Sequence, residues 1–71
     1  MDKTEIIKLL EAMRDSADYC YDRFKKERKH AAKNHYFGEY LAFDEVIRIL
    51  TKPEFAEKMK NIYLGSEKEA I

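Results

Sequence analysis

The stretch from Ile6 to Ala32 constrains the fold of this chain more than any other segment. It contains neither glycine nor proline, and strong helix formers such as alanine, leucine, glutamate, lysine and arginine are frequent in it. Its apolar residues recur every three or four positions, which is the spacing of one helical face and not the alternation of a β-strand. These residues are Ile6, Leu10, Met13, Ala17, Cys20, Phe24 and Ala31. The pattern predicts one long helix, capped at Asp2 or Thr4 and ending near Lys33.

The segments after this helix predict a turn and two shorter helices. Residues 34–38 begin with asparagine and end with glycine, and we expect them to form the turn. A second helix is expected over residues 37–50, by its apolar spacing. The sequence Thr-Lys-Pro-Glu at residues 51–54 resembles a capping box, with threonine as the cap of a third helix that stops at Gly65. Residues 66–71 are expected to be a frayed charged tail.

The lengths of these helices predict how they are arranged. The second and third helices together nearly match the first, so we expect the second to return along Tyr19–Ala32 and the third along Ile6–Ala17. Residues 1–65 would then form a single helical hairpin domain, one layer thick. A single layer encloses no core, so we expect two hairpins to dimerise into a four-helix-like bundle. The predicted fold class is all-α, a long helix with a broken antiparallel return.

The size of the chain and its second helix both favour self-association. A chain of 71 residues buries too little surface for more than marginal stability, and its only cysteine, Cys20, cannot form an internal disulfide. Apolar residues extend round most of the second helix, which one neighbouring helix cannot cover. The residues expected at an interface are Phe37, Leu41, Phe43, Val46, Ile49 and Leu50.

Composition excludes several classes of protein. The formal net charge is +0 although 39% of residues are charged, so no overall field attracts nucleic acid or a membrane surface. The hydrophobic content of 45% is too high for a disordered chain. No apolar run approaches the roughly 20 residues of a membrane span, and no signal segment is evident. We therefore expect a cytoplasmic protein with no membrane partner.

Few residues suggest catalytic or metal-binding chemistry. Two glycines provide no phosphate-binding loop, and the serines stand at no nucleophile motif. Glu27 and His30 have the Glu-x-x-His spacing of di-metal helical bundles, but such sites need two of these motifs and further inward carboxylates. A salt-bridging glutamate and a surface histidine are the simpler interpretation. We predict no enzyme activity, no cofactor and no metal site.

A group of cations near the end of the long helix leaves three interpretations open. Acidic residues precede these cations on the same helix face, and this order suits the helix dipole without any ligand. The same polarity would make two antiparallel copies of the helix complementary in charge. The third interpretation is a contact site for nucleic acid or a small anionic ligand such as a nucleotide, in which tyrosines stack. The candidate residues, here called the basic cluster with its two tyrosines, are Arg23, Lys25, Lys26, Arg28, Lys29, Lys33, Tyr36 and Tyr40.

These patterns favour a non-enzymatic helical interaction module. We expect a homodimer or higher homo-oligomer that binds another protein, such as a small regulator or a phage-type inhibitor. The alternative function is a binder of an anionic ligand, nucleotide or nucleic acid that uses the basic cluster.

Overall fold

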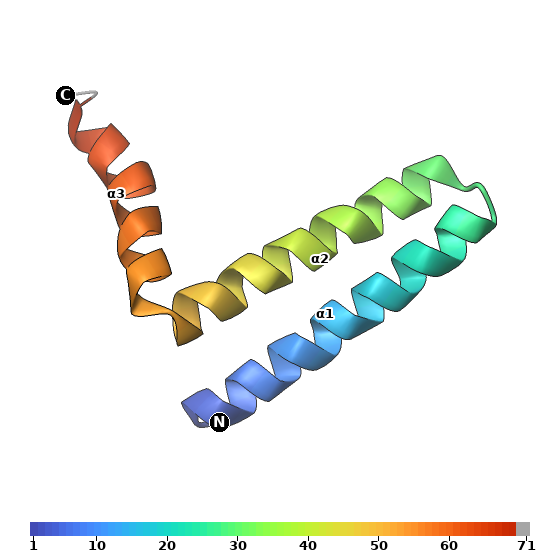
Figure 1. Ribbon diagram of the computed structural model, residues 1–71, viewed down its shortest axis with the longest axis horizontal. Coiled ribbons are helices and arrows are strands. Elements are labelled where there is room, and N and C mark those ends of the chain that lie inside the picture. The colour runs from blue at the N-terminus through green and yellow to red at the C-terminus, as the bar shows by residue number, and fades with distance from the viewer. Residues whose placement is uncertain (70–71) are drawn as a thin grey trace.

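The computed structural model of the protein describes residues 1–69, with side chains described as far as Gly65. These residues form α1 (Lys3–Lys26), α2 (His30–Thr51) and α3 (Pro53–Glu69), and no strand occurs among them (Figure 1). The prediction of an all-helical chain is therefore confirmed. The third helix continues past Gly65, so the predicted stop there is wrong. Residues 70–71 of the predicted tail lie outside the described residues.

Helices α1 and α2 form an antiparallel hairpin of nearly equal arms, 24 and 22 residues long. Of the two predicted caps of α1, Asp2 is the one observed, because its side chain accepts a hydrogen bond of 2.8 Å from the backbone N–H of Glu5. The turn, however, comes at residues 27–29 and not at residues 34–38. Residues 34–38 lie inside α2, which returns along the whole of α1 without a break.

The early turn is a Schellman motif, a hydrogen-bonded stop at a helix C-terminus. Arg28 adopts the left-handed conformation, with φ at 57°. Its N–H bonds to the carbonyl of Lys25, and the N–H of Lys29 reaches back to the carbonyl of Phe24 at 3.0 Å. The Lys29 ammonium also lies over the Phe24 ring, 5.7 Å from its centroid. Glycine is the usual residue at this position, and an arginine there leaves no recognisable signal in the sequence.

The junction between α2 and α3 is partly as predicted. Pro53 is the first residue of α3, where its missing N–H is tolerated, and Lys52 before it is extended. Thr51 does not cap α3, contrary to prediction. It is the last residue of α2, and its hydroxyl donates a hydrogen bond of 2.7 Å to the carbonyl of Ile47.

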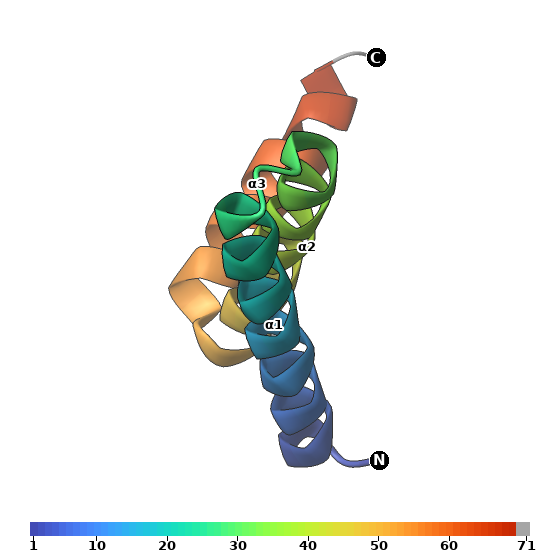
Figure 2. The same cartoon turned by 90° about the vertical axis from the view of Figure 1, so that its right-hand side faces the viewer.

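Helix α3 turns away from the hairpin. It packs against the end of α2, where the Arg48 guanidinium lies 5.8 Å from the Phe55 ring centroid, and it makes no packing contact with α1 among the described residues. The prediction that the third helix continues along Ile6–Ala17 is therefore wrong, because α2 already occupies that part of α1. The three helices lie close to one plane (Figure 2).

This planar arrangement leaves almost no core. Only Ala17 and Ile47, at 3% and 8% exposure, are buried among the residues with described side chains. The shortest dimension is 18 Å, and the radius of gyration is 15.3 Å, whereas a compact chain of this length has about 11 Å. The accessible surface is 5818 Å², against roughly 4,700 Å² for a compact protein of this mass. The chain is thus a single layer with an excess of roughly 1,100 Å² of exposed surface.

Candidate interaction surface

The hairpin has two faces, on either side of the seam between α1 and α2. Arg14 and Asp44 meet across the seam on one side, with 3.5 Å between Nη1 and Oδ1. Met13 and Phe43, each one residue earlier, line a groove on the other side, because successive helical residues point about 100° apart. We call these two sides the Arg14 face and the Met13 face.

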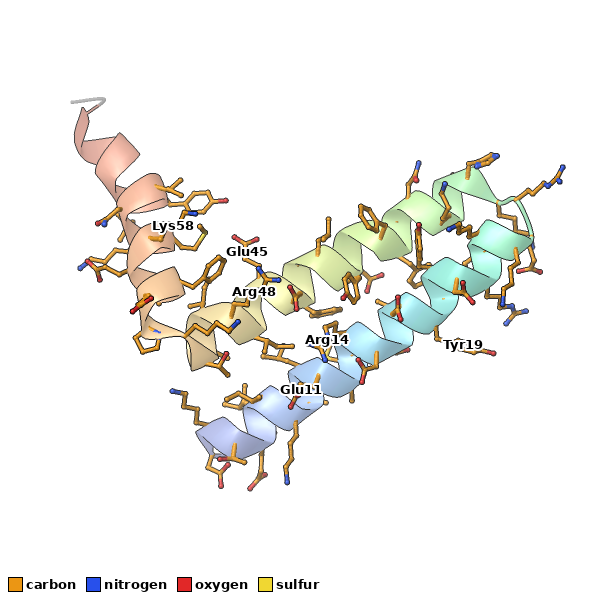
Figure 3. The ribbon with its side chains drawn as sticks, viewed as in Figure 1. Glu11, Arg14, Tyr19, Glu45, Arg48 and Lys58 are labelled. Atoms are coloured by element: carbon orange, nitrogen blue, oxygen red, sulfur yellow. The ribbon has the colours of Figure 1, made fainter. Side chains whose placement is uncertain are left out.

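The Arg14 face carries a chain of charges. Asp44 bridges two arginines, since it also lies 3.0 Å from Nε of Arg48 one turn further along α2. Figure 3 shows Arg14 between the two helices and Arg48 nearer to α3. Partial desolvation lowers the pKa of Arg14, but the hydrogen bond to Asp15 and the charges of Asp15 and Asp44 outweigh it, so this pKa lies above its usual value. These fixed charges make the Arg14 face expensive to bury.

The Met13 face is mostly apolar and hollowed. Its groove has a volume of about 300 Å³. Leu9 and Met13 on α1, with Val46 on α2, are exposed large apolar side chains on this side. Among the described residues, Glu39, which pairs with His35 at 2.8 Å, is the only charged one that lines the groove. The groove is lined by Ala12, Met13, Ser16, Ala17, Tyr36, Glu39 and Phe43.

The six residues predicted for an interface do not share one face. Phe37, Leu41, Val46 and Ile49 are between 39% and 49% exposed, whereas Phe43 and Leu50 are half-buried. Phe37 packs beside Tyr21 towards the Arg14 face, with 5.5 Å between ring centroids, while Phe43 lines the opposite groove. A single partner surface cannot cover all six, and their role at an interface stays a prediction.

The basic cluster gathers at the hairpin turn, and neighbouring carboxylates neutralise part of it. Lys26 pairs with Asp22 at 3.1 Å, and both Arg23 and Lys29 pair with Glu27. Lys25, Arg28 and Lys33 form no salt bridge within the described part of the chain. Of the two tyrosines, Tyr36 stacks on Phe24 with 5.5 Å between ring centroids, inside the seam.

The metal-like pair, Glu27 and His30, lies at the hairpin turn. Glu27 is the C-terminal cap of α1 and already pairs with two cations, and His30 is the first residue of α2. No group of three or more potential metal ligands occurs among the residues whose side chains are described.

Sequence reasoning missed the charge chain on the Arg14 face and the groove on the Met13 face. Both depend on the register between α1 and α2. The predicted turn begins seven residues too late, so it gives the wrong register. The only local signal was the four-residue spacing of Asp44 and Arg48 on one helix, which indicates one ion pair of the charge chain.

No family model, no curated protein sequence and no solved structure matches this chain. None of the helices in the described part of the chain is long and apolar enough to cross a membrane.

Proposed function

We propose that the protein is a non-enzymatic helical interaction module that acts as a homo-oligomer and binds another protein. The observation that supports this most is the shortage of buried surface, since only Ala17 and Ile47 are buried among the described side chains. Large apolar side chains on both edges of α2, among them Leu41 and Val46, are exposed instead. Domains need at least two packed layers, and this chain supplies one.

The surplus of surface has the size of an interface. An excess of roughly 1,100 Å² per chain exceeds the roughly 800 Å² that each partner buries in an interface of standard size. Two hairpins packed face to face would form a four-helix-like bundle, the dimer that we propose. A twofold symmetric dimer is the commonest way in which copies of one chain complete each other.

A concentration series of thermal unfolding tests the homo-oligomer. If folding is coupled to association, the midpoint temperature rises with total protein concentration. We expect the midpoint temperature to rise with each tenfold increase in protein concentration, with helix content followed by circular dichroism. A midpoint that stays constant across the micromolar range would mean that the single layer is stable alone, and the homo-oligomer would be refuted.

We propose that the other protein binds at Phe37 and Leu41. They lie one turn apart on α2, on the side away from Phe43, so a dimer through the opposite face leaves them accessible. A cytoplasmic regulator or inhibitor of phage type would act through such a patch. With Leu41→Asp, a protein that co-purifies with wild type should no longer be recovered, and the oligomeric mass should not change. With Lys60→Asp on α3, the control, that protein should still be recovered. Equal recovery with wild type and Leu41→Asp would refute this placement.

A second candidate function, anion or nucleic-acid binding, is favoured by one arrangement at the turn. Lys25 lies 5.9 Å from the ring centroid of Tyr21, and Tyr21 packs beside Phe37. Lys33 precedes Phe37 by one helical turn, so two lysines flank an aromatic pair. Stacking with adjacent positive charge is how single-stranded nucleic acid and nucleotides are held.

This candidate is tested with a labelled single-stranded oligonucleotide. Binding should weaken as salt rises from about 50 to about 200 mM, and Lys25→Gln/Lys33→Gln should abolish it. Lys58→Gln/Lys60→Gln on α3 is the charge-matched control and should bind as wild type does. No binding by wild type at low salt would eliminate the candidate.

A further inference from the structure

We propose that two copies associate through α1, laid antiparallel on α1 of the second copy about a twofold axis at the level of Arg14. The contact uses the outer edge of α1 and continues onto the Met13 face. This inference rests on the proposed homo-oligomer and specifies its interface.

The contrast between the two faces selects the Met13 side. The Arg14 face would have to bury the Arg14–Asp44–Arg48 charges, and the desolvation of such charges offsets their mutual attraction. The Met13 face exposes Leu9 and Met13 beside a groove with a single charged lining residue. Burial of apolar surface is the main driving force for association.

A second stripe on α1, apart from the one that packs on α2, runs along this side. Its residues follow at spacings of four and three, so they share one helical edge. Tyr19, the residue of this stripe labelled in Figure 3, points away from α2 and is 70% exposed. The stripe consists of Glu5, Leu9, Ala12, Ser16, Tyr19 and Arg23.

In this stripe, each residue matches the residue that lies equally far from Arg14 on its other side. Read from either end towards Arg14, it runs charged, large, small, and the charges at the two ends are opposite. In an antiparallel pair centred at Arg14, Ala12 meets Ser16 of the second copy, so the two backbones can approach closely at the centre.

The outer positions of the same stripe also match. Leu9 packs on Tyr19 of the second copy on each side of the small residues. Glu5 and Arg23 lie eighteen residues apart, about five full turns, so they point the same way. Each Glu5 therefore lies beside Arg23 of the second copy.

In the same arrangement, a side chain of the second copy reaches the groove. Met13 of the second copy arrives between Ala12 and Ser16, at the mouth of the 300 Å³ groove. Insertion of one side chain into the gap between residues of the facing helix is the knobs-into-holes packing of helical bundles. The contact would also cover Leu9, which a single chain leaves exposed.

Two sets of variants test this interface by sedimentation equilibrium. Ser16→Arg places a long charged side chain where the two helices approach most closely, and it should raise the dimer Kd at least about 100-fold. Ser16 is exposed in the single chain, so the hairpin should keep its helical circular dichroism. Asp18→Arg is the matched control: it is also exposed, makes a larger change in charge and points to the other side of α1, so the Kd should be unchanged.

A charge exchange tests the antiparallel orientation. Glu5→Arg and Arg23→Glu should each weaken the dimer, and the double variant should recover most of the loss. The two symmetry-related pairs account for about 2- to 25-fold in Kd. Arg23 also pairs with Glu27 within its own chain, and the double variant does not restore that pair, so recovery reports the contact between copies.

The outcomes separate this inference from the proposed function. A wild-type dimer that Ser16→Arg leaves intact overturns the α1 interface but not the homo-oligomer. If Ser16→Arg breaks the dimer but the losses from Glu5→Arg and Arg23→Glu simply add in the double variant, the antiparallel register is overturned. A monomeric wild type overturns both, and if Ser16→Arg then prevents capture of another protein, the face belongs to that protein instead of a second copy.

Discussion

Replacing Arg28 by glycine should stabilise the protein. Arg28 holds φ at 57°, and the left-handed region costs a residue with a Cβ roughly 1–2 kcal/mol. Glycine avoids this cost but loses roughly 0.5–1 kcal/mol through the greater freedom of the unfolded chain. Arg28 forms no salt bridge within the described residues, so little is lost with its side chain. The expected net gain is about 0.5–1 kcal/mol.

The sign of this effect tests where the turn lies. If a single helix ran to Lys33, as the sequence alone predicts, position 28 would be helical and glycine would cost about 1 kcal/mol. Urea unfolding at one fixed protein concentration measures the difference, which corresponds to a rise of roughly 2–8 °C in the thermal midpoint. Lys25→Gly, within the last turn of α1, is the control and should destabilise. A less stable Arg28→Gly variant would refute the Schellman turn.

Three further substitutions test the rest of the hairpin. Gly38→Ala should stabilise by roughly 0.5–1 kcal/mol in urea unfolding, because the added Cβ meets nothing within 4 Å inside α2; destabilisation would restore the turn at residues 34–38. Ile47→Ala should cost about 2–4 kcal/mol by the same assay, since Ile47 is one of the two buried residues among the described side chains, and a loss below about 1 kcal/mol would mean that the seam is not packed. Asp2→Ala should cost about 1 kcal/mol by removing the cap on Glu5, and an unchanged midpoint would contradict that hydrogen bond.

Three local signals in the sequence predicted local structure correctly. Helical spacing identified the apolar stripe of α1, Asp2 was one of the two predicted caps, and Pro53 marked the start of α3. Each of these depends on interactions within about one turn, which a short stretch of sequence contains.

The turn could not be predicted because Arg28, the residue in the left-handed conformation, is not a typical turn residue. Arg28 stands among charged helix formers, and Ala31 happens to continue the apolar spacing of α1 although it belongs to α2. Asn34 and Gly38 are better turn residues by composition, yet both lie inside α2. Once the turn was misplaced, every pairing between α1 and α2 was out of register, and the third helix was given a place that α2 fills.

The candidate surface could be predicted only in outline. Apolar residues on several sides of α2 indicated that one chain leaves surface uncovered, and the exposure of Phe37, Leu41 and Ile49 agrees with that. The division into a charged face and an apolar grooved face needs Arg14 opposite Asp44, a contact between residues thirty positions apart. Such long-range register is not encoded in the periodicity of either helix.

The mass of the wild-type protein in solution is the most direct test of its self-association. Sedimentation equilibrium across the micromolar range should give twice the 8.5 kDa of one chain, with dissociation on dilution. A mass of 8.5 kDa at every concentration, from a sample that remains helical and unfolds cooperatively, would contradict the homodimer.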